Sequence, residues 1–172
     1  FFLYFSLPSP HAPIIPNDEF DGKTEAGPYG DFVFQTDFII GQIFAALARK
    51  GLSENTIIIF TADNGPEHFA FDRMEKFQHE SSGTLRGLKR DVWEGGHRVP
   101  FIVRRGDATN SKVQPGTFSD QLLGVMDIFA TLIDITGTYH EEDQGMDSVS
   151  FWPQLQGKPE PGRQTLYQFS ND

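Results

Sequence analysis

The chain has 172 residues, with 14 Lys and Arg against 24 Asp and Glu, and it has no cysteine. This length fits one domain that buries a sizeable core. A net charge of −10 argues against nucleic-acid binding, which needs clustered Lys and Arg. The lack of cysteine excludes a disulfide, a thiolate metal site and a cysteine nucleophile within these residues.

The first predicted element is a strand over residues 1–7. This run is aromatic and apolar and is ended by Pro8-Ser9-Pro10, which is typical of a strand buried on both faces. Because the run has no polar leader before it, we expect the chain to be a segment of a longer protein. Uninterrupted apolar runs stay far below the ~20 residues of a membrane span, so we expect no span.

A loop over residues 8–30 and then a helix from Asp31 to about Lys50 come next. Asp31 is a suitable N-cap, and Lys50 suits the negative end of the helix dipole. Gly51 can adopt the left-handed conformation that ends a helix. Apolar residues cover much of the circumference, which predicts a well-buried helix.

A β-branched strand over residues 57–61 follows, and this composition is typical of a central parallel strand. Strong turn residues end it at 63–66. Residues 66–98 are polar and weakly periodic, a short strand is predicted over 99–103, and residues 106–117 read as a polar loop.

Residues 119–137 allow one long helix, or a strand over 121–125 followed by a helix capped by Asp127 and ended by Gly137. The second interpretation is favoured because Asp is a good N-cap and Gly a good stop. An acidic loop over 138–148 and a final strand over 166–169 complete the pattern. Alternating strands and helices predict an α/β fold with a mostly parallel central sheet flanked by helices. Ligands of such sheets bind beyond the carboxyl ends of the strands.

Two loops that follow the carboxyl ends of predicted strands carry candidate residues. Asp63 and Asn64 offer hard oxygen ligands for Ca²⁺ or Mg²⁺, although Asp-Asn-Gly is also favourable turn chemistry on any fold. His11 lies between prolines that would hold its ring in one direction, as a general acid or anion donor requires. An exposed loop histidine is the alternative interpretation.

A third candidate is Lys89, which lies among glycines and basic residues. Glycines let the backbone approach an anion closely, and an ammonium group suits a sulfate or phosphate oxygen. The alternative is that the neighbouring arginines are solvated or are paired with Asp91 and Glu94.

Taken in order, three motifs resemble the sulfatase family of the arylsulfatase type. They are Phe-Leu-Tyr-Phe-Ser-Leu-Pro-Ser-Pro-His-Ala-Pro, then Asn-Thr-Ile-Ile-Ile-Phe-Thr-Ala-Asp-Asn-Gly-Pro-Glu, then Leu-Arg-Gly-Leu-Lys-Arg-Asp-Val-Trp-Glu-Gly-Gly-His-Arg-Val-Pro. The resemblance implies an alkaline-phosphatase-like α/β fold. It identifies residues 1–172 as a partial, central-to-C-terminal part of a sulfatase catalytic domain, with 148–172 beginning a smaller C-terminal subdomain.

The resemblance also implies hydrolysis of sulfate esters and assigns roles to the candidates. His11 would contact the sulfate, and Lys89 would bind it and help the leaving oxygen. Asp63 and Asn64 would be two Ca²⁺ ligands. Four further members of the third motif would shape the loop; they are Glu94, Gly95, Gly96 and Arg98.

Departures from the family pattern are informative. The family nucleophile is a formylglycine made from Cys or Ser in a Cys/Ser-x-Pro-x-Arg motif. The nearest string here begins at Ser6 and has Pro10 where the arginine belongs. We therefore expect the formylglycine outside this sequence. The paired N-terminal aspartates of the calcium site and a Lys-x-x-His element are also missing, so we expect an incomplete calcium site and little or no activity in this segment alone.

The expected partner is a sulfated small molecule or a sulfated glycan, and the resemblance implies a periplasmic, secreted or lysosomal location. One alternative is a phosphodiesterase or phosphonate hydrolase of the same superfamily, since sulfate and phosphate sites use similar groups. Another is a non-catalytic sulfatase-like protein that binds anionic glycans. The nucleophile would separate these alternatives.

Overall fold

The computed structural model describes residues 1–106, 113, 115–141, 143–158 and 160–170. The chain divides into two compact units. Unit 1 comprises Phe1–Ser53 and Asn64–Val99, and unit 2 comprises Glu54–Asp63 and Pro100–Asp172. The predicted polar loop at 106–117 lies partly outside the described residues, as does Glu142 of the acidic loop.

Unit 1 is organised around α1 (Gly27–Arg49), which follows the short 3-10 helix η1 (Asp18–Phe20). The helix begins at Gly27 rather than at Asp31, because Pro28 is well suited to a first turn whose N–H groups have no helical partner. It ends as predicted, with Lys50 as C-cap and Gly51 at φ +66°.

Asp31 is therefore not a cap but a buried residue inside α1, with 1% of its surface exposed. Its carboxylate accepts backbone N–H groups from Gly22 at 2.9 Å and Thr24 at 2.7 Å. Burial opposes ionisation, but these hydrogen bonds outweigh it and lower the pKa of Asp31 below its ordinary value. The side chain fastens the preceding loop onto the helix.

The apolar core of unit 1 lies where η1 meets α1. The Phe20 ring, which is buried, packs against Phe34 and Phe38 with ring centroids 6.1 and 5.3 Å away. Phe34 and Phe38 nevertheless remain 45% and 48% exposed, so α1 is less buried than the sequence predicts. With 23 residues and a mean hydropathy of 1.3, α1 also meets two measures of a membrane-spanning helix. Core helices of soluble proteins meet the same measures, so they do not assign α1 to a membrane.

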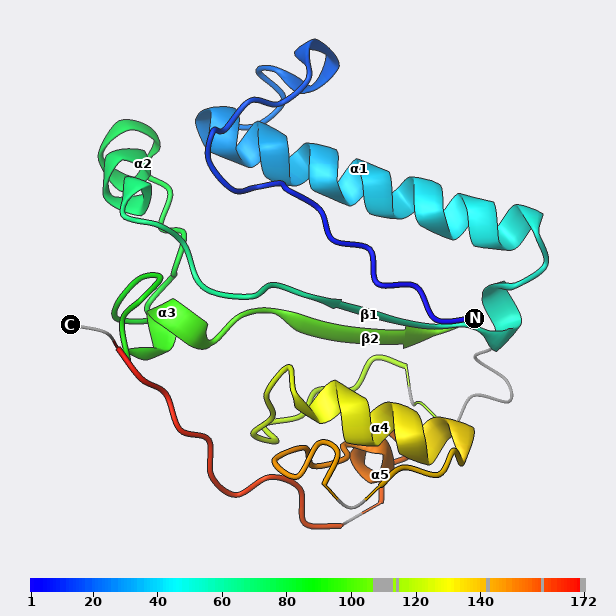
Figure 1. Ribbon diagram of the computed structural model, residues 1–172. Helices are drawn as coiled ribbons and strands as arrows, with labels where there is room; N and C mark the ends of the chain where they lie inside the picture. The colour runs from blue at the N-terminus through cyan, green and yellow to red at the C-terminus, as the bar shows by residue number, and fades with distance from the viewer. Residues whose placement is uncertain (107–112, 114, 142, 159, 171–172) are drawn as a thin grey trace. The chain divides into compact units, whose positions relative to one another are not determined.

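The strand predicted over residues 1–7 is not formed. This segment is extended, and its first five side chains, all large and apolar or aromatic, are exposed, from 53% at Phe5 to 88% at Phe1. A strand needs a neighbour to satisfy its backbone groups, and no described strand pairs with this one. The chain in dark blue runs back along α1 (Figure 1), where Thr36 Oγ1 donates to Ser9 Oγ at 2.7 Å.

Two helices lie in the stretch 66–98, for which the sequence predicts no element. They are α2 (Phe69–Phe77) and the single-turn α3 (Glu94–His97). Both belong to unit 1 and follow turns that carry candidate site residues.

Unit 2 contains β1 (Ile57–Thr61), which the 3-10 helix η2 (Ser53–Asn55) precedes, and β2 (Phe101–Arg105). The position of β1 is confirmed, and β2 begins two residues later than predicted. The strands pair antiparallel, with Thr61 opposite Phe101, so the predicted mostly parallel sheet is wrong for the described residues. The chain leaves β1 at one end of the ladder and, after residues 62–100, enters β2 at the same end. The two strands therefore run in opposite directions.

The rest of unit 2 contains α4 (Asp127–Thr136) and the single-turn α5 (Trp152–Leu155). Gly137 ends α4 at φ +66°, as predicted, but the strands predicted over 121–125 and 166–169 are not formed. Phe151, which precedes α5, packs edge-on against Phe101 of β2, with ring centroids 5.4 Å apart. This contact joins the ladder to the helical part of the unit.

Asp127 starts α4 but does not cap it, since its carboxylate accepts N–H groups from outside the helix. Oδ2 accepts from Gly124 N at 2.8 Å and Arg163 Nε at 2.9 Å. Oδ1 accepts from Val149 N at 2.8 Å and Arg163 Nη2 at 2.6 Å. Arg163 also donates to the carbonyl oxygens of Thr165 and Asp147, and it thereby ties the C-terminal segment to α4.

Candidate functional site

The candidate site lies in unit 1 and begins with the turn that presents His11. The His11 backbone N–H donates to Pro8 O at 3.0 Å. Its Nδ1 lies 2.7 Å from Ala12 O. A carbonyl oxygen only accepts, so the proton of the neutral ring is on Nδ1 and the lone pair is on Nε2. The ring is therefore held in one tautomer, with Nε2 directed away from its own turn.

Lys89 meets this nitrogen. Its Nζ lies 3.4 Å from His11 Nε2, although the two residues are 78 positions apart in the chain. An ammonium group only donates, so Lys89 donates to the lone pair of His11. The structure thus brings together the two residues that the sequence analysis proposed for the sulfate.

A third member of this cluster, Glu67, was not predicted. The Lys89 backbone N–H donates to Pro66 O at 2.9 Å, which places the two loops side by side. Glu67 Oε1 lies 3.3 Å from Lys89 Nζ, and Glu67 Oε2 accepts from Arg90 Nη1 at 3.1 Å. The hydrogen bond from Arg90 is the main cause that lowers the pKa of Glu67 to about 2; partial burial opposes it, and Lys89 adds to it.

Only a weak signal in the sequence points to Glu67. It is the one carboxylate directly after the turn at 63–66, and two consecutive cations occur at 89 and 90. Charge pairing between segments so far apart depends on the fold that joins them.

Close contacts between glycines hold the loops together. Gly65 N donates to Gly96 O at 2.9 Å, and Gly95 and Gly96 are buried in α3. A Cβ atom at Gly65 would collide with the Gly95 carbonyl oxygen. Only glycine permits this approach, so α3 supports the turn from which Glu67 extends.

Asp63 and Asn64 are the candidate calcium ligands. Asp63 belongs to unit 2, and Asn64 is the first residue of the second stretch of unit 1. Asn64 Nδ2 donates to Gly65 O at 2.8 Å. Carboxylate and amide oxygens suit Ca²⁺, but this ion takes about 6–8 oxygen ligands. Among the described residues, no group of three or more His, Cys, Asp or Glu side chains is placed to hold a metal ion. The two residues fit the ion in donor type but not in number, so the calcium site stays a prediction.

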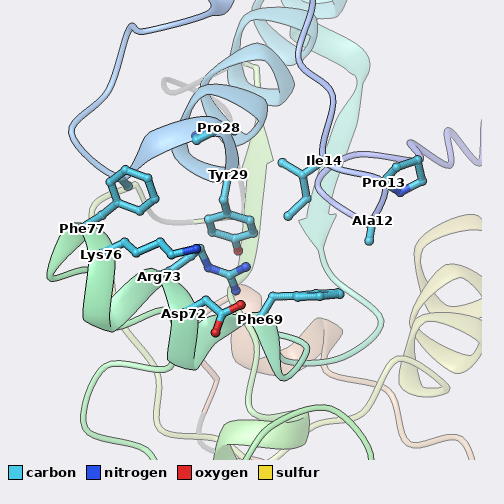
Figure 2. A pocket seen from close by; sticks show the side chains of 11 residues that line it. Ala12, Pro13, Ile14, Pro28, Tyr29, Phe69, Asp72, Arg73, Lys76 and Phe77 are labelled. Carbon is cyan, nitrogen blue, oxygen red and sulfur yellow. The ribbon is translucent and has the colours of Figure 1, made fainter.

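Two hollows adjoin these loops within unit 1. One has a volume of about 510 Å³ and is lined by the cluster residues Glu67, Lys89 and Arg90 together with apolar side chains of α2. The other, of about 310 Å³, lies between α1, α2 and the residues after His11 (Figure 2). Its walls are mainly apolar, and the buried Arg73 guanidinium lies 3.8 Å from the centroid of the Tyr29 ring. Because Lys89 lines the larger hollow, that one adjoins the candidate chemistry.

The sequence is similar to a known protein family. Residues 1–138 match the family model described as Sulfatase. The chain is 37% identical, over 98% of its length, to N-acetylgalactosamine-6-O-sulfatase of Bacteroides thetaiotaomicron. It is 34% identical, over 92% of its length, to steryl-sulfatase of Homo sapiens. The chain spans 33% and 26% of the length of these two relatives.

The comparison with solved structures finds one from work on glycosaminoglycan metabolism by Bacteroides thetaiotaomicron. It is similar in backbone, with a TM-score of 0.74 and 36% sequence identity over 88% of this chain and 31% of that one.

Proposed function

The chain belongs to the sulfatase family, and from this premise we propose that it supplies the sulfate-holding part of an enzyme that hydrolyses sulfate esters. The observation that carries the proposal is the 3.4 Å approach of Lys89 Nζ to His11 Nε2, two residues that the family resemblance assigns to the sulfate. Because the chain spans about a third of its relatives' length, the complete reaction is proposed for a whole protein that contains this segment.

The contacts of Lys89 and His11 indicate how this site would bind an anion. Lys89 carries its charge on an ammonium group whose side chain is 20% exposed, so an incoming sulfate oxygen can reach it. His11 Nε2 accepts from Lys89 at rest, and it becomes a donor once the ring is protonated. Both groups would then donate to sulfate oxygens and stabilise the negative charge that develops during hydrolysis.

Lys89 also holds a proton at Nζ that the departing alcohol oxygen requires. A general acid must lie within hydrogen-bond reach of the oxygen that it protonates. The hollow of about 510 Å³ adjoins Lys89 and gives space for the alcohol portion of the ester. We therefore assign Lys89 two roles, sulfate binding and protonation of the leaving oxygen.

In the family, formylglycine supplies the nucleophile and Ca²⁺ offsets the charge of the sulfate group. Asp63 and Asn64 would be two of the calcium ligands here. The substrate belongs to the class of sulfated small molecules or sulfated glycans, which the relatives' names support by mentioning N-acetylgalactosamine and steryl sulfate esters. A periplasmic, secreted or lysosomal location belongs to the same proposal, and so does a smaller C-terminal subdomain beginning at 148–172.

The first test measures anion binding by the 172-residue chain. Sodium sulfate is titrated at constant ionic strength with chloride as the balancing salt, and backbone amide signals near His11 and Lys89 are followed by NMR. Lys89→Ala is expected to weaken sulfate binding at least about tenfold, because a hydrogen bond from a charged group is lost. The exposed Lys50→Ala is the matched control. Equal affinity in wild type and Lys89→Ala contradicts the assignment.

The second arm measures turnover of 4-nitrophenyl sulfate in a chain extended to the full length of its relatives. There Lys89→Ala is expected to lower kcat by about 10²–10³-fold, as removal of a transition-state donor does. Unchanged turnover would overturn the proposed role.

A further inference from the structure

We propose that Glu67 is a positioning residue whose carboxylate holds Lys89 against His11, so that one ammonium N–H stays available for the sulfate. This inference rests on the proposed function, since it concerns the same anion site. Glu67 does not touch the substrate in this proposal but acts through Lys89.

The distances define a chain of contacts from carboxylate to ammonium to imidazole. Glu67 Oε1 lies 3.3 Å from Lys89 Nζ, which in turn lies 3.4 Å from His11 Nε2. An ammonium group has three N–H donors, and these two partners use two of them. In the part of the chain that the structure describes, no further partner of Lys89 Nζ is present, and the side chain is partly exposed. The remaining N–H is therefore the one that an anion would meet.

Arg90 fixes the carboxylate from its other side. Glu67 Oε2 accepts from Arg90 Nη1 at 3.1 Å, and His68 Nδ1 lies 3.5 Å from the same oxygen. Arg90 has a φ of +82°, a conformation that residues other than glycine seldom adopt. This conformation reverses the chain directly after Lys89, and the Arg90 side chain returns to the carboxylate that Lys89 also meets.

Orientation, rather than stability, is what this cluster provides. The Arg90 side chain is 67% exposed, and exposed ion pairs contribute little to folding. A free lysine side chain has many rotamers, and ordering it on binding has an entropy cost. Because Glu67 already orders the Lys89 side chain, sulfate binding does not include this entropy cost.

A second interpretation is that Glu67 only balances the charges of Lys89 and Arg90. The two interpretations predict opposite signs. A carboxylate near an anion site repels the anion, so removing a mere counter-charge tightens sulfate binding. Removing a positioning residue weakens sulfate binding in spite of the lost repulsion.

The test compares two variants in the 172-residue chain with inorganic sulfate as the probe. Glu67→Gln removes the charge and keeps the shape, whereas Glu67→Asp keeps the charge and shortens the reach. Both are expected to weaken sulfate binding by about threefold to tenfold, because the ammonium loses its preset position. Glu75→Gln, which removes one charge from an exposed position of α2, is expected to bind sulfate as wild type does. Unchanged or tighter binding in Glu67→Gln overturns the proposal, and so does wild-type affinity in Glu67→Asp.

A readout on the lysine itself separates positioning from a general structural role. In the unmodified, ¹⁵N-labelled chain, the Lys89 ammonium protons are expected to exchange with water more slowly than those of the exposed Lys50. In Glu67→Gln this protection is lost while the urea midpoint stays within error. Equal exchange of Lys89 and Lys50 in the wild-type chain overturns the proposal without any variant. If Lys89→Ala itself leaves sulfate binding intact, the proposed function fails; if only the Glu67 variants do so, this inference alone fails.

Discussion

An arginine fastens Asp127 in unit 2 and Glu67 in unit 1, but the two clusters differ in how fully their hydrogen-bonding groups are used. In unit 2 the Asp127 carboxylate is 1% exposed and accepts from Gly124, Val149 and Arg163. In unit 1 Glu67 is 19% exposed and is shared by Lys89 and Arg90. In the first cluster the carboxylate is saturated with donors and closed to water, whereas the second keeps an accessible cation, Lys89, whose side chain is 20% exposed.

The difference separates a structural ion pair from the cluster for which sulfate binding is proposed. Burial makes an ion pair costly to break, because each partner would be left charged and unpaired. A partly exposed pair contributes little stability, but its cation can exchange partners for an incoming anion. The same kinds of residue thus hold the fold together in unit 2 and, under the proposed function, order a sulfate-binding lysine in unit 1.

The largest expected effect is a loss of stability, and it tests the cluster of Asp127 and Arg163. Asp127→Ala is expected to lower the free energy of unfolding by about 3–5 kcal/mol, because it leaves the largely covered Arg163 guanidinium and the N–H groups of Gly124 and Val149 without their acceptor. Urea denaturation measures the loss. Asp134→Ala, an exposed change on α4, is expected to remain within about 0.5 kcal/mol of wild type. Sulfate affinity should be the same in both variants, and equal stability of the two would contradict a structural role for Asp127.

The ion pair of Asp127 and Arg163 also makes the stability of the fold depend on pH. Burial raises the pKa of this carboxyl, but hydrogen bonds from Arg163 and the backbone outweigh it, so the pKa lies below its ordinary value of 3.8. A carboxyl with a depressed pKa stabilises the fold above its ordinary value and loses this contribution as the pH falls through the folded-state pKa. Acid unfolding is therefore expected to be less steep in Asp127→Ala than in wild type.

The next prediction tests the unsaturated cluster through the titration of Glu67. Its pKa of about 2 lies below the ordinary 4.5, chiefly because Arg90 donates to it. Arg90→Ala is expected to raise this pKa toward 4.5, although Lys89 and His68 still face the carboxylate. The small stability that its ion pairs contribute is present above about pH 4.5 and is lost as the pH falls toward 2. Carbon-13 NMR of the carboxyl group measures the midpoint, and Arg49→Ala is the control. A midpoint that does not move in Arg90→Ala contradicts the hydrogen bond from Arg90 to Glu67.

Local chemistry explains which elements could be predicted. The strand at Ile57–Thr61 consists of residues that favour strands wherever they occur. Gly51 and Gly137 end their helices because a left-handed residue is needed at those positions, and this requirement is local. The start of α1 was missed because Pro28 supplied a start signal before Asp31.

Features that depend on distant segments could not be predicted in the same way. Residues 1–7 have strand composition, yet a strand forms only beside a partner. The direction of the β1–β2 pair follows from the path of the chain between them, which composition does not encode. Among the site residues, His11 and Lys89 were found through motifs. Glu67 was missed because its role depends on the backbone contact between Pro66 and Lys89.

The smallest expected effect concerns the ion pair between Glu94 and Arg98 in unit 1. Among the described residues, this pair is separate from the contacts that join Glu67, Lys89 and His11. Arg98 Nη1 lies 3.0 Å from Glu94 Oε2, and the two side chains are 64% and 59% exposed. A double-mutant cycle of Glu94→Ala and Arg98→Ala is expected to give a coupling energy of about 0.3–0.5 kcal/mol, the range for exposed pairs four residues apart on a helix. Sulfate affinity should change less than about twofold, because neither charge is desolvated beside the site.

A coupling above about 1 kcal/mol, or a marked loss of sulfate binding, would place this pair with the cluster of Glu67 and Lys89 rather than outside it. Exposure alone would then fail to separate the two kinds of pair in unit 1. If the small effect is found, the distinguishing property is instead the contact with His11: only the cation that meets a second candidate sulfate ligand responds to the anion. The third motif would then divide into Lys89, which binds, and Glu94 and Arg98, which shape the loop around it.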